Sequence, residues 1–421
     1  MIASDPPIPV PIRRYRYSKL RWRVAVHALD ALGGVLAWIW RRLIPVPRVE
    51  MPARILVLQL DHLGDAILSS PIFPRLRAAY PAARIDVLAS TSNRAVFEAD
   101  PQVDRVLLAE RTWFGGRPGL WDLIGSVWRL GMRLRAERYD LAIDVRGDVL
   151  SVLVMAIAGA RRRLGWSMGG GGFLLTDVAP WRPLRHEVAS RMALLDVLGL
   201  PREDAPRVVA HPTDADRLRV GRRLRRAWPG RSRVSVGASR EVSRASRVVE
   251  QAEEAEPPLL AIHVGAGTAA KRWPARHWGD LVGRFVAEGW RVVVVGDRGD
   301  RAMEGLGGVR DWTGRLALME TAALLERVDL FIGVDSGPAH LAACAGVPSI
   351  VLFSGTNRVA QWRPWSHRTR VLRQRVACRP CHRKVCPLAD HPCMAGITPE
   401  RVYRASIRWL RRMHRAEGPD G

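Results

Sequence analysis

The segment from Asp329 to Phe353 constrains the fold more than any other part of the chain, because strand-like and helix-like runs alternate within it. It reads DLFIGVDSGPAHLAACAGVPSIVLF. An apolar run, Leu330 to Val334, ends in a tight turn, and a helix-length run then continues to Gly346, after which a second apolar run begins. Pro338 suits the first turn of that helix, and Gly346 suits its left-handed end. The segment therefore predicts a strand, a helix and a strand of a parallel α/β sheet.

The turn in this segment carries groups that suit an anionic ligand. Backbone amides at the helix start, beside Ser336 and Gly337, favour an anion such as a diphosphate. Asp335 could accept hydrogen bonds from sugar hydroxyls. An ordinary crossover with a capped helix explains the same residues equally well, since such turns occur in many α/β proteins.

The same alternation recurs from Arg54 onward and predicts a first domain. Four apolar runs are separated by helix-length pieces: residues 55–60, 85–89, 106–108 and 141–145. They predict a parallel, doubly wound sheet. Asp65 lies just beyond the carboxyl end of the first run, at the edge where open α/β sheets bind ligands, so it is a candidate general base. An acid that interacts with a helix dipole is an equally good interpretation.

A second domain is predicted where the apolar run 259–264 precedes the sequence GAGTAAKRWP. Its glycines match a dinucleotide fingerprint only superficially, because Pro274 interrupts the expected helix and the next acid follows too late. A loop whose amides and Lys271 hold a diphosphate fits better. Asp300, beyond the run 291–295, could reach a ribose or a base, and a solvated loop is the alternative.

The charge of the chain indicates an anionic partner. The 421 residues include 66 Lys+Arg against 41 Asp+Glu, which gives a net charge of +25, and 48% of them are hydrophobic. This hydrophobic content is typical of globular proteins, and the chain is long enough to form two domains. Neither an RNA-binding motif nor a DNA-reading helix is recognisable, so we expect phosphates and an anionic membrane rather than nucleic acid.

The first fifty residues form a separate basic segment. Its apolar run, Val24 to Trp40, is shorter than the ~20 residues that span a bilayer, and it contains His27 and Asp30. Flanking Arg and Trp residues favour a helix that lies along an anionic membrane. No cleavage site follows, so we expect no secretory signal. A helix packed on the protein's own body is the alternative.

Two further stretches carry weaker signals. Residues 161–166, RRRLGW, and the glycine run 169–172 predict a flexible loop that faces the cleft, and a simple linker is the alternative for the glycine run. Residues 201–257 are rich in Arg, Ser, Glu and Ala, and they predict an interdomain connection with a partly disordered insertion.

Four motifs, in this order, resemble glycosyltransferase family 9, the ADP-heptose:lipopolysaccharide heptosyltransferases. They are DHLGDAILSSP from Asp61, RRRLGW from Arg161, HVGAGTAAKRWPARHW from His263 and GVDSGPAHLAA from Gly333. The resemblance implies an α/β GT-B fold, in which two Rossmann-like domains with parallel sheets face a central cleft. It also implies inverting sugar transfer without a metal or another cofactor.

The resemblance further implies roles for particular residues. Asp65 matches the family's general base, and Lys271 matches the lysine on the diphosphate. Asp335, with Ser336 and Gly337, matches the turn that holds the donor. The other substrate-binding residues expected from these motifs are Gly64, Thr268, Asp300 and His340. Relatives often carry a glutamate near the position of Asp300, and the role of the histidine could be structural.

We therefore expect a membrane-associating segment at 1–50, an acceptor domain at 51–200, an Arg-rich linker at 201–257, a nucleotide-sugar domain at 258–398, and a C-terminal helix with a tail at 399–421. The expected partners are an ADP-sugar donor, an anionic glycolipid acceptor such as a lipopolysaccharide core, and an anionic membrane surface. The expected location is cytoplasmic, peripheral on the inner face of the inner membrane.

Three other functions share part of these features. They are a nucleotide-sugar epimerase or a different GT-B transferase, an NAD-dependent oxidoreductase, and a non-catalytic scaffold at the membrane.

Near the C-terminus, four cysteines with interleaved histidines could bind zinc: Cys378, Cys381, Cys386 and Cys393. A local disulfide is a further alternative, and we expect reduced thiols because the cytoplasm is reducing.

Overall fold

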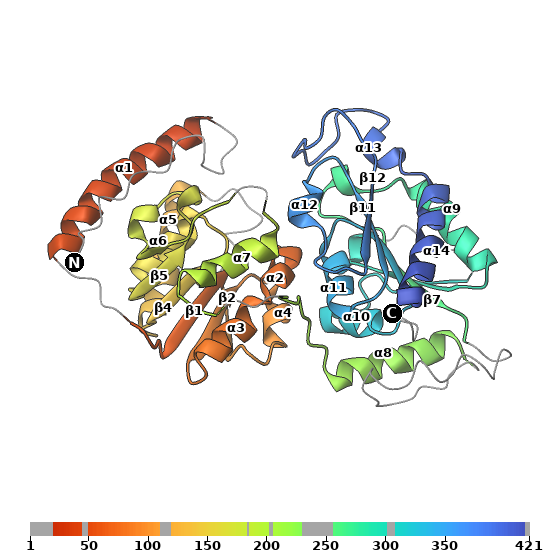
Figure 1. Cartoon of the computed structure of the whole chain (residues 1–421), viewed down its shortest axis with the longest axis horizontal. Helices are drawn as coiled ribbons and strands as arrows, with labels where there is room; N and C mark the ends of the chain where they lie inside the picture. Colours follow the sequence, from red (N-terminus) through yellow and green to blue (C-terminus); the bar gives the residue numbers. More distant parts are fainter. Residues whose placement is uncertain are drawn as a thin grey trace. The chain divides into compact units, whose positions relative to one another are not determined.

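The protein divides into two compact units, Met1–Pro206 and Arg207–Gly421. The computed structural model describes residues 20–43, 49–109, 119–182, 185–201, 205–229, 256–300 and 308–416. Each unit contains one six-stranded sheet, and every strand pairing in both sheets is parallel (Figure 1). The predicted α/β class and the parallel sheets are thereby confirmed.

The first unit is a doubly wound sheet in the order β3-β2-β1-β4-β5-β6. Its strands are β1 (Arg54–Gln59), β2 (Arg84–Ala89), β3 (Arg105–Leu108), β4 (Leu141–Asp144), β5 (Arg162–Gly165) and β6 (Asp177–Val178). Its helices from β1 onward are α2 (Leu63–Ser69), α3 (Ile72–Ala79), α4 (Arg94–Glu98), α5 (Leu120–Arg135), α6 (Val149–Ile157) and α7 (Glu187–Asp196). The chain reverses its direction of travel across the sheet between β1 and β4, which is where such folds bind ligands.

The core of the first unit follows from the alternation of side chains along β1. Leu56 and Leu58 point to the same face of the sheet and are fully buried. They pack in one cluster with Val127 and Leu130 of α5 and with Val152 of α6. Burial on both faces explains why β1 reads as a continuous apolar run.

The second unit repeats this plan in the order β12-β11-β10-β7-β8-β9. Its strands are β7 (Leu259–His263), β8 (Arg291–Val295), β9 (Val309–Asp311), β10 (Leu330–Val334), β11 (Ser349–Phe353) and β12 (Thr369–Arg373). Its helices are α8 (Asp214–Ala227), α9 (Ala275–Ala287), α10 (Leu318–Leu325), α11 (Gly337–Ala345), α12 (Val359–Trp362), α13 (Pro392–Ala395) and α14 (Pro399–Ala416). Here the reversal lies between β7 and β10.

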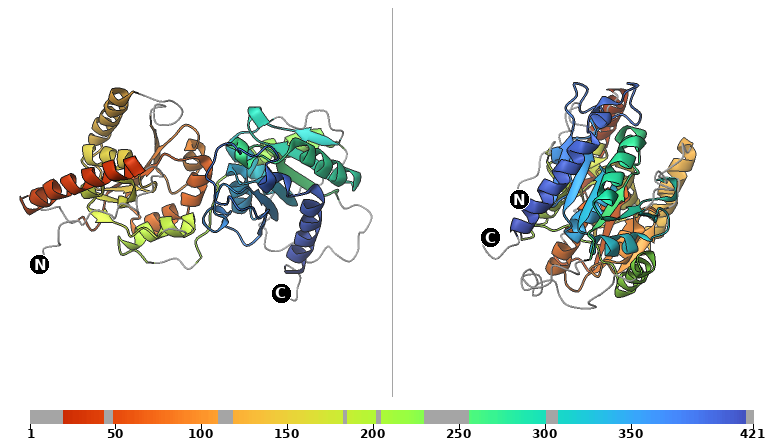
Figure 2. Two further views of the ribbon diagram at one scale, coloured as in Figure 1. Left: turned by 90° about the horizontal axis from the view of Figure 1, so that it is seen from above. Right: turned by 90° about the vertical axis from the view of Figure 1, so that its right-hand side faces the viewer.

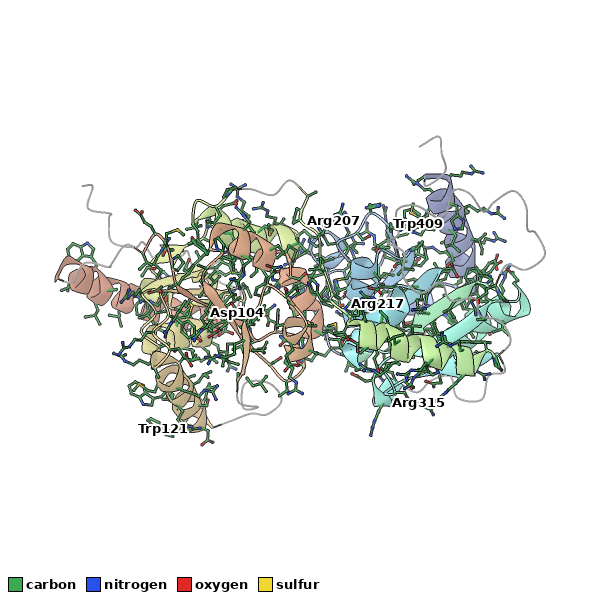
Figure 3. The ribbon with its side chains drawn as sticks, turned by 90° about the horizontal axis from the view of Figure 1, so that it is seen from below. Asp104, Trp121, Arg207, Arg217, Arg315 and Trp409 are labelled. Atoms are coloured by element: carbon green, nitrogen blue, oxygen red, sulfur yellow. The ribbon has the colours of Figure 1, made fainter. Side chains whose placement is uncertain are left out.

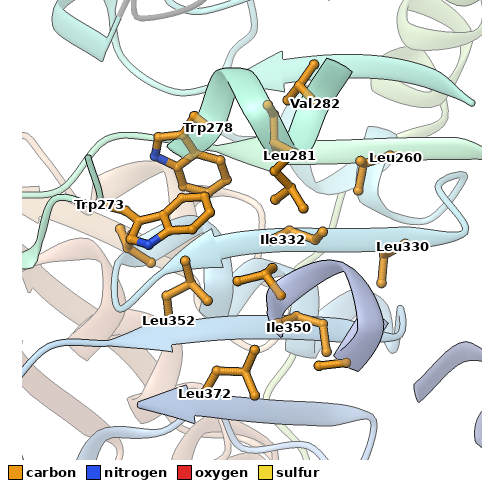
Figure 4. Packing of buried hydrophobic residues seen from close by; sticks show 14 of the residues in the cluster. Leu260, Trp273, Trp278, Leu281, Val282, Leu330, Ile332, Ile350, Leu352 and Leu372 are labelled. Carbon is orange, nitrogen blue, oxygen red and sulfur yellow. The ribbon is translucent and has the colours of Figure 1, made fainter. Parts of the chain in front are cut away.

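Two tryptophans close one end of the second core (Figure 4). The rings of Trp273 and Trp278 meet edge to face, with centroids 4.8 Å apart. The Trp273 indole N–H donates to the carbonyl oxygen of Ile397 at 2.8 Å, so its polar atom is satisfied within the core. This packing fixes the C-terminal end of the loop that begins at Gly265.

The glycine run 169–172 is not the flexible loop that the sequence predicted. Arg162–Gly165 forms strand β5, and the glycines lie in or beside two 3-10 turns, η3 (Ser167–Gly169) and η4 (Gly172–Leu174). A Cβ on Gly169 would lie only 2.0 Å from the carbonyl oxygen of Gly147. Close backbone packing therefore explains this glycine, and the segment is a fixed part of the unit.

Helix α1 (Leu20–Leu43) packs on this glycine segment through one face. Asp30 Oδ1 accepts a hydrogen bond from the backbone N–H of Gly171 at 2.7 Å, and Val26 lies directly over Gly170. The Phe173 ring lies against Gly33 of α1, where a Cβ would clash. The alternative of a helix packed on the protein's own body is therefore correct for this face.

The opposite face of α1 is apolar and exposed. Its large hydrophobic residues, between 46% and 71% exposed, are Leu20, Val24, Leu29, Leu32, Val35, Leu36 and Ile39. Among the described residues, no helix combines the length and apolar character that crossing a bilayer requires. One face of α1 is thus packed on the first unit, and its apolar opposite face is exposed in the described chain.

The Arg-rich segment differs from the predicted linker, because it contains α8 and this helix belongs to the second unit. Arg217 and Arg219 of α8 form ion pairs with Glu326 and Glu320, at 2.8 and 2.6 Å, beside α10. Residues 230–255, on which the expected disordered insertion falls, lie outside the described residues. Part of the basic charge of this segment therefore serves to attach a helix.

Gly169→Ala should destabilise the first unit by about 2 kcal/mol, because the new methyl group would overlap backbone atoms that cannot rotate away. The matched control is Gly283→Ala in α9, where a Cβ would meet nothing within 4 Å. That change should be neutral, or stabilising by up to about 1 kcal/mol, since alanine is the better helix former. Urea unfolding of both variants measures the difference, and equal stability would contradict this account of Gly169.

Candidate active site

The predicted base, Asp65, lies at the reversal point of the first sheet. His62 precedes the first turn of α2, and Gly64 and Asp65 both lie within that turn. Strand β1 ends at Gln59, so the turn follows directly at its carboxyl edge. The structure thus places Gly64 and Asp65 where the sequence predicted them.

Asp65 belongs to a group of three charged side chains. Its Oδ1 accepts a hydrogen bond from Arg191 Nη2 of α7 at 3.0 Å. Arg191 Nη1 lies 3.3 Å from Glu187 Oε2, so two carboxylates share one guanidinium that is only 2% exposed. Burial raises the pKa of Asp65; Arg191 opposes this shift and Glu187 adds to it. A carboxylate in this setting retains basicity that a simple ion pair would remove.

A second acidic group occupies the neighbouring strand end. Arg146 Nε lies 3.0 Å from Asp61 Oδ1 and 2.9 Å from Asp148 Oδ2. Asp144, the last residue of β4, is fully buried, and its carboxylate accepts backbone N–H bonds from the turn that carries Arg146 and Gly147. Burial and the charge of Asp148 raise the pKa of Asp144 to about 7. This group fixes the turn after β4 beside the motif that contains Asp65.

In the second unit, Lys271 and Asp335 form a direct ion pair. Lys271, in the turn η5 (Ala269–Lys271), places Nζ 2.7 Å from Asp335 Oδ2, just beyond β10. Asn357 Nδ2 donates to the same oxygen at 2.9 Å. The Lys271 side chain is 22% exposed and that of Asp335 is 6% exposed, so the cation is the more accessible partner. Two residues for which the sequence predicted separate roles therefore contact each other directly.

His263, the last residue of β7, lies between two further predicted site residues, Ser336 and Asp300. Its Nδ1 lies 3.0 Å from Ser336 Oγ, and its Nε2 lies 3.6 Å from Asp300 Oδ2. Asp300, in η6 (Arg298–Asp300), sits directly over Gly265, where a Cβ would lie 2.0 Å from its carboxyl carbon. The interaction with His263 is the main cause that lowers the pKa of Asp300. Asp300 is thus a held, ionised acid rather than part of a solvated loop.

The remaining predicted residues lie around the start of α11 and on the loop after β7. Ser336 precedes α11, and Gly337 is the first helical residue. His340 is buried within the same helix, at 5% exposure. Thr268 precedes η5, and its Oγ1 is buried without a hydrogen-bond partner. These residues present helix amides, one cation and polar side chains at the carboxyl edge of β7 and β10.

Sequence reasoning missed four residues of these groups: Glu187, Arg191, His263 and Asn357. His263 had a signal, since it lies one residue before the end of the predicted run 259–264 and begins a family motif. Asn357 follows the next strand of the sheet, β11, at the same edge. The two α7 residues had none, because they lie more than a hundred residues from Asp65 in the sequence.

The four C-terminal cysteines are free thiols, and Cys393 is buried. Within the described part of the chain, no three His, Cys, Asp or Glu side chains are arranged to hold a metal ion. Their segment contacts the turn η5 through its backbone: the Ala270 N–H donates to the carbonyl oxygen of Lys384 at 3.0 Å. The segment therefore supports the loop that carries Lys271.

Solved structures share the fold of these two α/β units. The E. coli ADP-heptose lps heptosyltransferase II superposes with a TM-score of 0.65 at 24% identity, covering 86% of this chain and 99% of that chain. E. coli heptosyltransferase WaaC with ADP-2-deoxy-2-fluoro heptose has a TM-score of 0.59 at 17% identity, covering 84% of this chain and 99% of that one. The fold defines the protein as a member of the GT-B class, as predicted.

Sequence comparison identifies the family within this class. The model of glycosyltransferase family 9 (heptosyltransferase) matches residues 127–391, which is more than half of the chain. The lipopolysaccharide heptosyltransferase 2 of E. coli K12 is 27% identical over 362 residues, covering 83% of this chain and 96% of that protein. The chain belongs to glycosyltransferase family 9, and it is therefore a glycosyltransferase, which confirms the resemblance seen in the four motifs.

Asp144→Asn should change how stability depends on pH. Folding raises the pKa of this carboxyl from about 4 to about 7. The protonated carboxyl therefore contributes its full stabilisation of the fold below pH ~4, and this contribution is lost as the pH rises to about 7. The variant cannot ionise and avoids this loss, so its melting temperature relative to wild type should rise over that interval. The exposed Asp280→Asn is the control. Parallel curves for wild type and Asp144→Asn would contradict the shift.

Proposed function

We propose that the protein transfers heptose from ADP-heptose to a lipopolysaccharide core or a related anionic glycolipid, with inversion at the anomeric carbon. Membership of glycosyltransferase family 9 supports sugar transfer. The relatives support heptose and lipopolysaccharide, since one is a lipopolysaccharide heptosyltransferase and one similar structure contains ADP-2-deoxy-2-fluoro heptose. The single observation that carries the donor assignment is the Lys271–Asp335 pair beside the helix start at Gly337.

The donor diphosphate would bind at this pair. Its oxygens would accept hydrogen bonds from the N-terminal amides of α11. They would also replace the Asp335 carboxylate as the partner of the Lys271 ammonium group. Asp335 and Asn357 then become available to sugar hydroxyls, and Asp300 to the nucleoside. Positive charge on Lys271 and the helix amides stabilises the leaving ADP as its bond to the sugar breaks. The proposed reaction therefore uses neither a metal ion nor another cofactor.

Asp65 would act as the general base. An acceptor hydroxyl attacks the anomeric carbon, its proton passes to the Asp65 carboxylate, and the electrons of the broken carbon–oxygen bond leave with ADP. Arg191 holds the carboxylate in place, while Glu187 balances the charge of that guanidinium. Asp61 is the rival base, and its carboxylate is paired with Arg146.

The N-terminal helix would attach the enzyme to the cytoplasmic face of the inner membrane, where a glycolipid acceptor resides. One face of α1 is fixed to the first unit by Asp30, so the exposed leucines on the other face can enter the headgroup region. The net charge of +25 favours an anionic surface. This location is peripheral.

Asp65→Asn should lose about 10²- to 10⁴-fold in turnover and retain donor binding, because the amide preserves shape but cannot accept the proton. Asp61→Asn is the matched comparison, four residues earlier. Steady-state transfer to a glycolipid acceptor measures turnover, and calorimetric titration with ADP-heptose measures binding. Near wild-type turnover in Asp65→Asn, with loss in Asp61→Asn, would show that the base is Asp61.

Lys271→Ala should weaken donor binding, because the diphosphate loses its cation. A charge-assisted contact of this kind contributes about 1.5–3 kcal/mol, or roughly ten- to a hundred-fold in Kd. The control is Lys384→Ala, an exposed lysine whose backbone carbonyl accepts from Ala270 in the turn that carries Lys271. Thermal stabilisation across a panel of nucleotide sugars would also identify the donor. Equal donor affinity of the two variants would contradict the assignment.

A further inference from the structure

Helix α5 carries a narrow apolar stripe on its outer side. The four residues and their exposed fractions are Trp121 81%, Ile124 49%, Trp128 57% and Met132 44%. Their spacing of three, four and four residues places them on one side of a helix. Figure 2 shows α5 projecting from the first unit, and Figure 3 labels Trp121 at its outer end. Two largely exposed tryptophans on one stripe are unusual for a surface that faces only water.

The stripe is not needed for the core of the unit. The opposite side of α5 supplies Val127, Leu130 and Leu134, which are buried against α6 and the sheet. Gly131 lets α5 approach Ile157 of α6 closely, since a Cβ there would lie 2.5 Å from that side chain. The helix is therefore already held by its inner side, and its outer stripe is available to another partner.

Basic side chains flank the stripe. Arg129 and Arg133 are exposed on α5, and Arg133 Nη2 donates to the carbonyl oxygen of Leu108 at 2.8 Å. Tryptophan and arginine together suit the headgroup region of a bilayer, where the ring lies at the boundary and the guanidinium meets lipid phosphate. A second copy of the chain suits the stripe less well, because each copy brings a net charge of +25 toward the other.

The stripe also belongs to the unit that carries the exposed face of α1. Helix α6 contacts both α5 and η4, and α1 rests on η4. We propose that the stripe of α5 is a second contact with the anionic lipid bilayer, in addition to α1. This inference rests on the proposed membrane attachment. Two contacts that reach the same bilayer from one unit act together, so each strengthens the binding made by the other.

Sedimentation of the full chain with vesicles tests the proposal. The vesicles are phosphatidylcholine alone or phosphatidylcholine with phosphatidylglycerol. Three double variants are compared with wild type: Trp121→Gln with Trp128→Gln on α5, Leu32→Gln with Leu36→Gln on α1, and Leu218→Gln with Val385→Gln as the control. The control residues are 52% and 67% exposed and lie in the second unit. Unchanged melting temperatures show that each variant is folded.

We expect the α5 variant to bind anionic vesicles about ten-fold or more weakly than wild type, because two large apolar groups no longer leave water. The control should bind as wild type does. Wild-type binding by the α5 variant, with loss in the α1 variant, would overturn the stripe but leave the membrane attachment intact. Absence of any preference of wild type for anionic vesicles would overturn both, and transfer to a water-soluble acceptor would still test the chemistry. A wild-type dimer that becomes monomeric in the α5 variant would assign the stripe to a second copy instead.

Discussion

Parallel pairing of the strands is the constraint on which the rest of this structure depends. In each unit it brings the carboxyl ends of all six strands to one edge of the sheet, and the reversal of strand order leaves space there for a ligand. The acidic group of the first unit and the cation with its helix start in the second unit lie at these reversal points. The same geometry thus yields a proton acceptor in one unit and a phosphate site in the other.

Sequence patterns predicted eight of the twelve strands in the described residues, because burial on both faces makes a parallel strand a continuous apolar run. The strands β5, β6, β9 and β12 were not predicted. They could not predict which charges pair. Lys271 and Asp335 were each expected to face a ligand, yet they also face one another, 2.7 Å apart. The hydrogen bond between Arg191 and Asp65 joins two helices that are 126 residues apart in the sequence, and no local pattern encodes it. The glycine run was misinterpreted because short 3-10 turns have no periodicity and resemble a loop.

The positive charge of the chain also has more than one role. Arg75 donates to three backbone carbonyl oxygens, those of Met192, Leu200 and Pro201, and pairs with Asp196. This side chain ties α3 to the end of α7 and is only 7% exposed, so it attracts no external anion. The Arg75–Asp196 pair adds nothing to the net charge, so this arginine serves the fold alone. For the proposed membrane contact, the basic residues that count are exposed ones, such as those beside the stripe of α5.

The pairing of Lys271 with Asp335 bears on how a catalytic cycle would end. Lys271 is already paired with a carboxylate within the protein, so its charge is not offered alone to an incoming phosphate group. Under the proposed reaction, ADP that remains after transfer must compete with a carboxylate held in place by Asn357. Re-formation of the ion pair would then favour nucleotide departure, and the resting enzyme would resist occupation by simple phosphate ions. An acid that competes with the nucleotide for Lys271 would thus assist product release.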